Sequence, residues 1–65
     1  MEKQMSLKAL RVNEKLTQTE AAAGLGVSQK TISNWEKGIT HPNQKAIEKI
    51  CEFYGVSYDF IDFDA

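Results

Sequence analysis

Apolar residues recur along the chain at intervals of three and four, which is the spacing of one face of an α-helix. The alternation of β-branched and polar residues that is typical of a strand is absent. Capping residues and glycines divide the apolar pattern into short segments. The pattern therefore predicts an all-α fold of five short helices, at residues 7–13, 18–25, 29–37, 44–54 and 58–62.

The boundaries of these helices rest on local signals. Thr17 and Glu20 match a capping box, in which the threonine hydroxyl accepts from the third helical amide while the glutamate reaches back to the cap amide. Gly26 ends the second helix, because glycine adopts a positive φ without a Cβ penalty. The other helices are expected to begin after the capping residues Ser6, Ser28, Asn43 and Ser57.

Only residues 26–28 separate the second predicted helix from the third. Two helices joined at a steep angle by a short turn containing glycine form a helix-turn-helix. Ala22 is small enough for the two axes to approach, and Ile32 and Trp35 are spaced to pack back on the second helix. Together these features predict a helix-turn-helix at about residues 17–37.

The length of 65 residues allows one domain, which we expect to span residues 1–65. One cysteine and one histidine exclude an internal disulfide and a zinc-ligand set. The sequence indicates no cofactor, metal or small-molecule ligand. It also contains no recognisable set of catalytic residues, so we do not expect the protein to be an enzyme. The chain has no apolar run of membrane-spanning length and no signal-peptide pattern at its N-terminus, which favours a cytoplasmic protein.

Charge first argues against a nucleic-acid partner, because the net charge is −1 and the pI is about 5.7. The charge is unevenly distributed, however. Residues 1–45 hold seven basic and four acidic residues, a net +3, while residues 46–65 hold one basic and five acidic residues, a net −4. This asymmetry is compatible with a polyanion that contacts one face of the protein, although the charge pattern alone favours an ordinary solvated surface.

Residues 16–38 read LTQTEAAAGLGVSQKTISNWEKG, and this stretch resembles the lambda-repressor-like Cro/CI family, also called the XRE family. The resemblance continues to about residue 61 and implies a compact five-helix fold whose third helix lies in the DNA major groove. The chain departs from the family pattern at four positions, which suggest a looser second helix and a less apolar fourth: Ala21, Gly24, Gln44 and Glu48.

The side of the third predicted helix that faces away from Ile32 and Trp35 is polar. Glutamine can pair with adenine and lysine with guanine in the major groove. The resemblance implies base contacts from Gln29, Lys30, Ser33 and Asn34 and a phosphate contact from Gln18. Loop residues, including Asn43, are candidates for further backbone contacts. The complete predicted DNA-binding set is Gln18, Ser28, Gln29, Lys30, Thr31, Ser33, Asn34, Lys37, Thr40 and His41.

The resemblance also implies a structural salt bridge between Arg11 and Glu36, and a homodimer on a near-palindromic operator. Phe63 is expected to dock either on its own domain or on the partner, or else residues 62–65 are expected to fray. The predicted dimer residues are aromatic or apolar and lie toward the C-terminus: Phe53, Tyr58, Phe60, Ile61 and Phe63.

Two functions follow from these patterns. The first is a sequence-specific binder of double-stranded DNA, a small transcriptional regulator of phage or mobile-element type that acts as a repressor. The alternative is a protein-interaction module, such as an antitoxin or the adaptor of a complex, that acts through its acidic aromatic C-terminus at residues 56–65.

Overall fold

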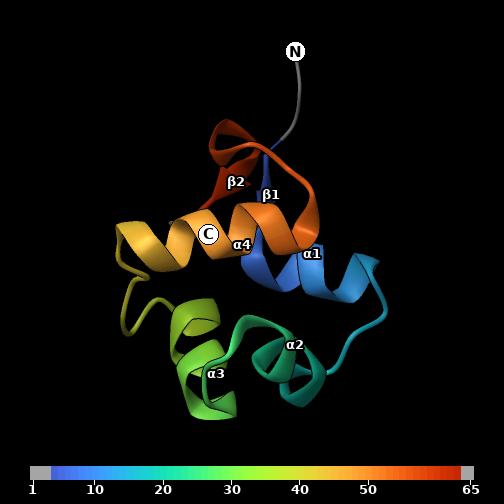
Figure 1. Ribbon diagram of the computed structural model, residues 1–65, viewed down its shortest axis with the longest axis vertical. Coiled ribbons are helices and arrows are strands. Elements are labelled where there is room, and N and C mark those ends of the chain that lie inside the picture. Colours follow the sequence, from blue (N-terminus) through green and yellow to red (C-terminus); the bar gives the residue numbers. More distant parts are fainter. Residues whose placement is uncertain (1–3, 64–65) are drawn as a thin grey trace.

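The computed structural model describes residues 4–63. Four α-helices follow a short first strand, and the chain closes with a 3₁₀ turn and a second strand (Figure 1). The predicted bounds of the first four helices are confirmed. In chain order the elements are β1 (Met5–Ser6), α1 (Leu7–Asn13), α2 (Gln18–Leu25), α3 (Gln29–Lys37), α4 (Gln44–Tyr54), η1 (Tyr58–Phe60) and β2 (Ile61–Asp62).

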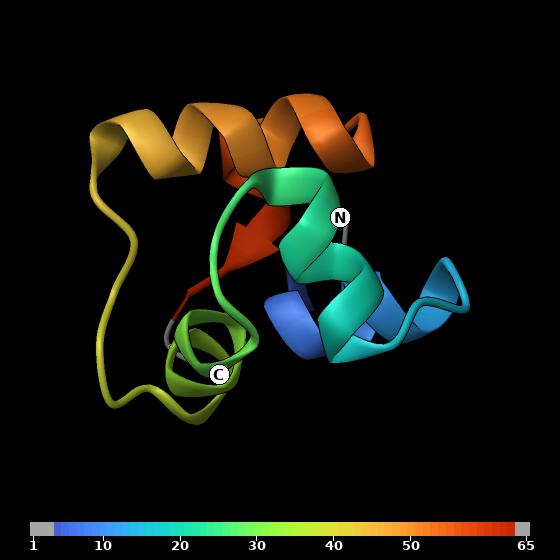
Figure 2. The same ribbon diagram turned by 60° about the horizontal axis from the view of Figure 1, so that its bottom comes forward.

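Side-chain caps fix where the helices begin. At α2 the amide of Glu20 donates to the Thr17 hydroxyl at 3.1 Å, and the amide of Thr17 donates to the Glu20 carboxylate at 2.8 Å. Gly26 follows α2 with a φ of 72°, in the left-handed region that glycine adopts without strain. The chain therefore changes direction within three residues, and α3 packs against α2 at a steep angle (Figure 2).

The C-terminal segment corrects the prediction of an all-α fold with five helices. Residues 58–60 form a single 3₁₀ turn, and β2 follows it and pairs in parallel with β1, with Met5 opposite Ile61. The side chain of Gln4 strengthens this closure by donating to the carbonyl of Asp59 at 3.0 Å. In the part of the chain that the structure describes, the fold is four α-helices, one 3₁₀ turn and a two-stranded sheet that joins its two ends.

The core lies where the helices meet β2. Ile50 of α4 is completely buried and stands at its centre. Trp35, Tyr54, Phe60 and Phe63 are half-buried and pack around it. The buried residues of this cluster come from α1, α2, α3, α4 and β2, and they are Leu7, Leu10, Ala22, Leu25, Ile32, Ile50 and Ile61.

The core also changes the set of residues expected at a dimer interface. Ile61 is only 3% exposed, because β2 carries its side chain into the protein's own core, so it is not available to a partner. Phe60 and Phe63 are partly buried and pack against the same core. Phe53 and Tyr58 remain exposed at the surface. Of the predicted tail, residues 64–65 lie outside the described residues.

No helix within residues 4–63 combines the length and the apolar character that crossing a membrane requires.

Candidate nucleic-acid interface

Helix α3 turns one side to the core and the other to solvent. Ile32 is buried and Trp35 packs against the core, as their spacing predicts. Gln29 and Lys30, in the first turn, are exposed, and so is Lys37 at the last position. The predicted base-contacting residues Ser33 and Asn34 are only half-exposed. Two of the three exposed residues of α3, Gln29 and Lys30, therefore lie at its N-terminal end.

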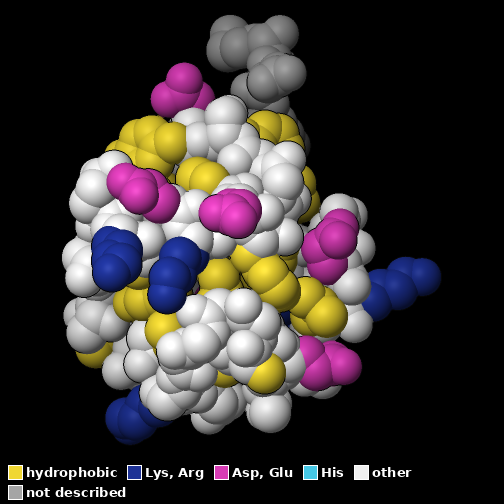
Figure 3. Space-filling view, in the orientation of Figure 1, with side chains coloured by type: hydrophobic (Ala, Val, Ile, Leu, Met, Phe, Trp, Pro, Cys, Tyr) yellow, Lys and Arg dark blue, Asp and Glu magenta, His cyan; other side chains and the backbone are white. Residues whose placement is uncertain are grey.

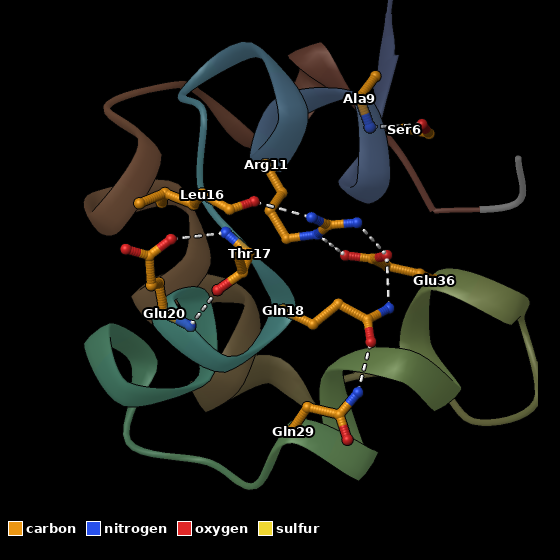
Figure 4. Close-up of polar contacts among 9 residues, drawn as sticks. All are labelled: Ser6, Ala9, Arg11, Leu16, Thr17, Gln18, Glu20, Gln29 and Glu36. Atoms are coloured by element: carbon orange, nitrogen blue, oxygen red, sulfur yellow. Dashed lines mark hydrogen bonds and ion pairs between the residues drawn. The ribbon is translucent and has the colours of Figure 1, made fainter.

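A chain of polar contacts connects this N-terminal end to the interior (Figure 4). The Gln29 side-chain amide donates to the Gln18 carbonyl oxygen, and the Gln18 amide donates in turn to Glu36 Oε1 at 3.1 Å. Gln18 and Gln29 are the first residues of α2 and α3. The contact holds the two helix starts together and limits the rotamers that the Gln29 side chain can adopt.

The chain of contacts ends in an ion pair between Arg11 and Glu36, the two residues that the family resemblance paired. Arg11 Nε donates to Glu36 Oε2 at 2.7 Å and Nη2 donates to Oε1 at 3.1 Å, a bidentate arrangement. Arg11 Nη1 donates to the carbonyl of Leu16 at 2.8 Å. The hydrogen bond to Glu36 raises the pKa of Arg11, outweighing the opposing effect of burial.

The ion pair also decides which charges α3 presents to solvent. Glu36 is the one acidic residue of α3, and its side chain is 6% exposed and paired with Arg11. The charges of α3 that remain at the surface are those of Lys30 and Lys37. The exposed side of α3 is therefore cationic although the whole chain has a net charge of −1.

Several predicted contact residues have a second, structural role. The Ser28 hydroxyl caps α3 by accepting from the amide of Thr31 at 3.1 Å, and it lies 2.9 Å from the Thr31 hydroxyl. Asn43 caps α4 by accepting from the amide of Ala46 at 2.8 Å. The caps orient these side chains and occupy the oxygen atoms that accept from the helix amides. A ligand could contact only the outward side of each side chain.

Other predicted residues lie away from this group. Thr40 and His41 are exposed in the loop after α3. Gln29 and Lys37 are separated by about 12 Å along the helix axis, at a rise of about 1.5 Å per residue. The structure thus brings Gln18, Gln29 and Lys30 together at one end of α3 and places Lys37 with the loop residues at the other.

The sequence prediction missed the contact between Gln18 and Gln29. A signal exists, because each glutamine follows the capping residue of its helix and the two helices are joined by a three-residue turn. Lys45 and Lys49 of α4 line a surface hollow beside Trp35. Residues 4–63 contain no group of three or more histidine, cysteine, aspartate or glutamate side chains that could hold a metal ion.

A short two-helix unit with a cationic outer helix is characteristic of DNA-binding helix-turn-helix proteins. The helix-turn-helix family model matches residues 7–61, so the chain belongs to this family. This match confirms the resemblance that residues 16–38 suggested.

The chain is similar to three named relatives. It is 42% identical over 50 residues to the cryptic phage CTXphi transcriptional repressor RstR of Vibrio cholerae, covering 77% of this chain and 45% of the relative. It is 39% identical over 59 residues to the HTH-type transcriptional activator BcrR of Enterococcus faecalis, and the match covers 91% of this chain and 29% of the relative. It is 44% identical over 55 residues to an uncharacterized HTH-type transcriptional regulator of Methanocaldococcus jannaschii, and the match covers 85% of this chain and 83% of the relative.

The matched region thus spans less than half the length of the first two relatives. No solved structure matches the chain.

Proposed function

We propose that this protein is a sequence-specific DNA-binding transcriptional regulator, in which α2 and α3 form the helix-turn-helix and α3 enters the major groove. The observation that carries the proposal is the N-terminal end of α3. There Gln29 and Lys30 are exposed, and Gln18 holds the Gln29 side chain in place. Both side chains match donor and acceptor patterns of base edges in the major groove.

The protein acts as a homodimer on a near-palindromic operator, in the cytoplasm, and represses by occupying its site. One α3 offers few side chains for base contacts, whereas two of them can enter successive major grooves about 34 Å apart. Phe53 and Tyr58 are the exposed aromatic residues for such a dimer. Repression is supported by the name of the RstR relative, while the activator BcrR gives the opposite precedent. The proposal assigns no catalytic role to any residue.

Selection of bound duplexes from a random pool at two salt concentrations tests this function. Specific recognition predicts an enriched sequence with two-fold symmetry, and phosphate contacts predict weaker binding at the higher salt concentration. Enrichment of a motif without symmetry would retain DNA binding and reject the homodimer. A pool that stays random at both salt concentrations would reject the proposed function.

The alternative, a protein-interaction module, depends on residues 56–65. Within this segment Ile61 is buried and Phe60 and Phe63 pack on the core, so removal of the segment would damage the fold itself. Substitution of the exposed Tyr58 is the better test of this alternative. If Tyr58→Ala abolished binding of a partner protein while DNA binding and thermal stability were unchanged, the interaction function would be favoured.

A further inference from the structure

A hollow of about 150 Å³ lies between the turn after α2 and the first half of α4, and we call it the Trp35 hollow. Its walls are mainly apolar and come from Leu25, Val27, Trp35 and Ala46, while Asn43, Lys45 and Lys49 complete the lining. A cavity of this volume in another protein holds one benzene ring. The Trp35 hollow is therefore large enough for a single ring or a branched carbon group.

The rim of the hollow is cationic. Lys45 and Lys49 are four residues apart on α4, so they lie one above the other on the same side of the helix. Neither forms an ion pair with any of residues 4–63. Figure 3 shows basic side chains over α4 at one end of a band of hydrophobic surface that runs below this helix.

The neighbouring acidic residues do not cancel this charge. Glu48 accepts from the side-chain amide of Gln44 at 3.5 Å and does not line the hollow. Glu52 lines a separate, more open hollow beside Gly24 and Phe53. The Trp35 hollow is lined by two lysines and by no acidic residue, which favours an anion there, whereas Lys49 and Glu52 both line the second hollow.

We propose that the Trp35 hollow binds a small amphipathic anion, namely one aromatic ring that carries a carboxylate on a short chain. The ring fills the apolar space against Trp35, and the carboxylate reaches Lys45 and Lys49. Burial of apolar surface supplies affinity, and the charge contacts supply selectivity for the acid. The proposal does not rest on the proposed DNA binding, and its test uses the protein alone.

Trp35 is the single tryptophan of the chain, so its fluorescence reports directly on the hollow. The probe is 3-phenylpropionate. Two matched compounds each lack one half of it: 3-phenylpropan-1-ol has the ring without the charge, and propionate has the charge without the ring. We expect a saturable change in Trp35 fluorescence with 3-phenylpropionate and at least about fivefold weaker binding of each matched compound. A linear response, or equal binding of the acid and the alcohol, would overturn the proposal.

Three variants locate the binding on the protein. Lys45→Gln with Lys49→Gln should weaken binding of 3-phenylpropionate at least about fivefold, and Ala46→Leu should block it by filling the hollow without changing the charge. Lys8→Gln with Lys15→Gln removes two exposed lysines elsewhere and should leave binding unchanged. The titration is repeated by NMR, in which the methyl chemical shifts of Leu25 and Val27 report binding in the hollow. Only variants whose thermal unfolding matches that of the wild type are compared. Unchanged affinity in the Lys45 and Lys49 variant would overturn the assignment.

Discussion

The ring of Phe53 on α4 lies against Gly24 on α2, in the space that a side chain at position 24 would occupy. A Cβ on Gly24 would be 2.6 Å from Phe53 Cζ, which is closer than side chains pack. Gly24 is inside α2, where glycine costs up to about 1 kcal/mol relative to alanine. The close approach of the ring explains why this position, unusual for the family, tolerates the cost.

This contact predicts that the effect of Gly24→Ala depends on Phe53. In a Phe53→Ala background the alanine should raise the free energy of unfolding by about 0.5–1 kcal/mol through its helix propensity. In the wild type the gain should disappear, because the phenylalanine ring must move away. Chemical denaturation of the four proteins gives the coupling. Equal effects of Gly24→Ala in the two backgrounds would show that the contact has no energetic role.

Removal of Arg11 should cost much more than removal of an ordinary surface charge. Arg11→Ala leaves the Glu36 carboxylate, whose side chain is 6% exposed, without its counter-ion, and it leaves the Leu16 carbonyl without this donor. Loss of one partner of this part-buried, bidentate pair should destabilise the fold less than loss from a fully buried pair, and we expect a loss of about 1–2 kcal/mol in the free energy of unfolding.

The matched control for Arg11 is Lys8→Ala, which removes an exposed charge from the same helix. We expect the control to change stability by less than about 0.5 kcal/mol. Urea denaturation of both variants measures the difference. A loss for Arg11→Ala that falls within the range of the control would mean that Gln18 and solvent compensate for the missing guanidinium group.

The first four helices could be predicted closely because their limits are encoded by neighbouring residues. The capping box at Thr17 and Glu20 and the glycine at position 26 each act within a few residues of the helix end they define. The sheet could not be predicted in this way. Met5 pairs with Ile61, 56 positions away, and two-residue strands are too short to show an alternating pattern.

The same distinction applies to the candidate site. The exposure of Lys30 follows from helical spacing, because Lys30 lies almost opposite Ile32 around the helix, so the sequence alone indicates it. Gln29 precedes Ile32 by three residues and lies beside it on the helix surface, so spacing does not predict that Gln29 is exposed. The contact between Gln29 and Gln18 joins two helices and depends on how they pack. The error over Ile61 has a related origin, since an apolar residue near the C-terminus suits a dimer surface equally well until the fold places it in the core.

The link between Gln18 and Gln29 predicts that their effects on DNA binding are not additive. Gln18→Ala frees the Gln29 side chain, so it should weaken binding to the selected duplex and reduce preference at the base pair that Gln29 contacts. The double variant should lose little more than Gln29→Ala alone, because the two residues act as a unit. Fluorescence anisotropy with the selected duplex measures all three. Fully additive losses would mean that each glutamine makes its own independent contact.

Lys30 should contribute to base selectivity. Lys30→Ala is expected to weaken binding to the selected duplex by about 1–3 kcal/mol and to relax preference at one position of each half-site. The exposed Lys8 of α1 provides the control, and Lys8→Ala should leave the selected sequence unchanged. Repeating the duplex selection with both variants gives the measurement. A uniform loss across all sequences would assign Lys30 to a phosphate instead.

Tyr54 predicts a decline in stability at alkaline pH. Burial, followed by the nearby Glu36 carboxylate, raises the pKa of the Tyr54 phenol above its ordinary value of 10.0, with Arg11 opposing the shift. A phenol with a higher pKa in the folded state holds its proton more tightly there. Its contribution to stability is therefore complete below the unfolded pKa and is lost as the pH rises through the folded pKa.

The thermal unfolding midpoint should consequently fall as the pH rises above about 10, and it should fall less steeply in Tyr54→Phe, which has no proton to lose. Tyr58→Phe is the control, because Tyr58 is 58% exposed and the substitution likewise removes only a hydroxyl group. The control should follow the wild type. If Tyr54→Phe and the wild type declined in parallel, the alkaline loss would have to come from other titrating groups, and the burial of Tyr54 would not be its cause.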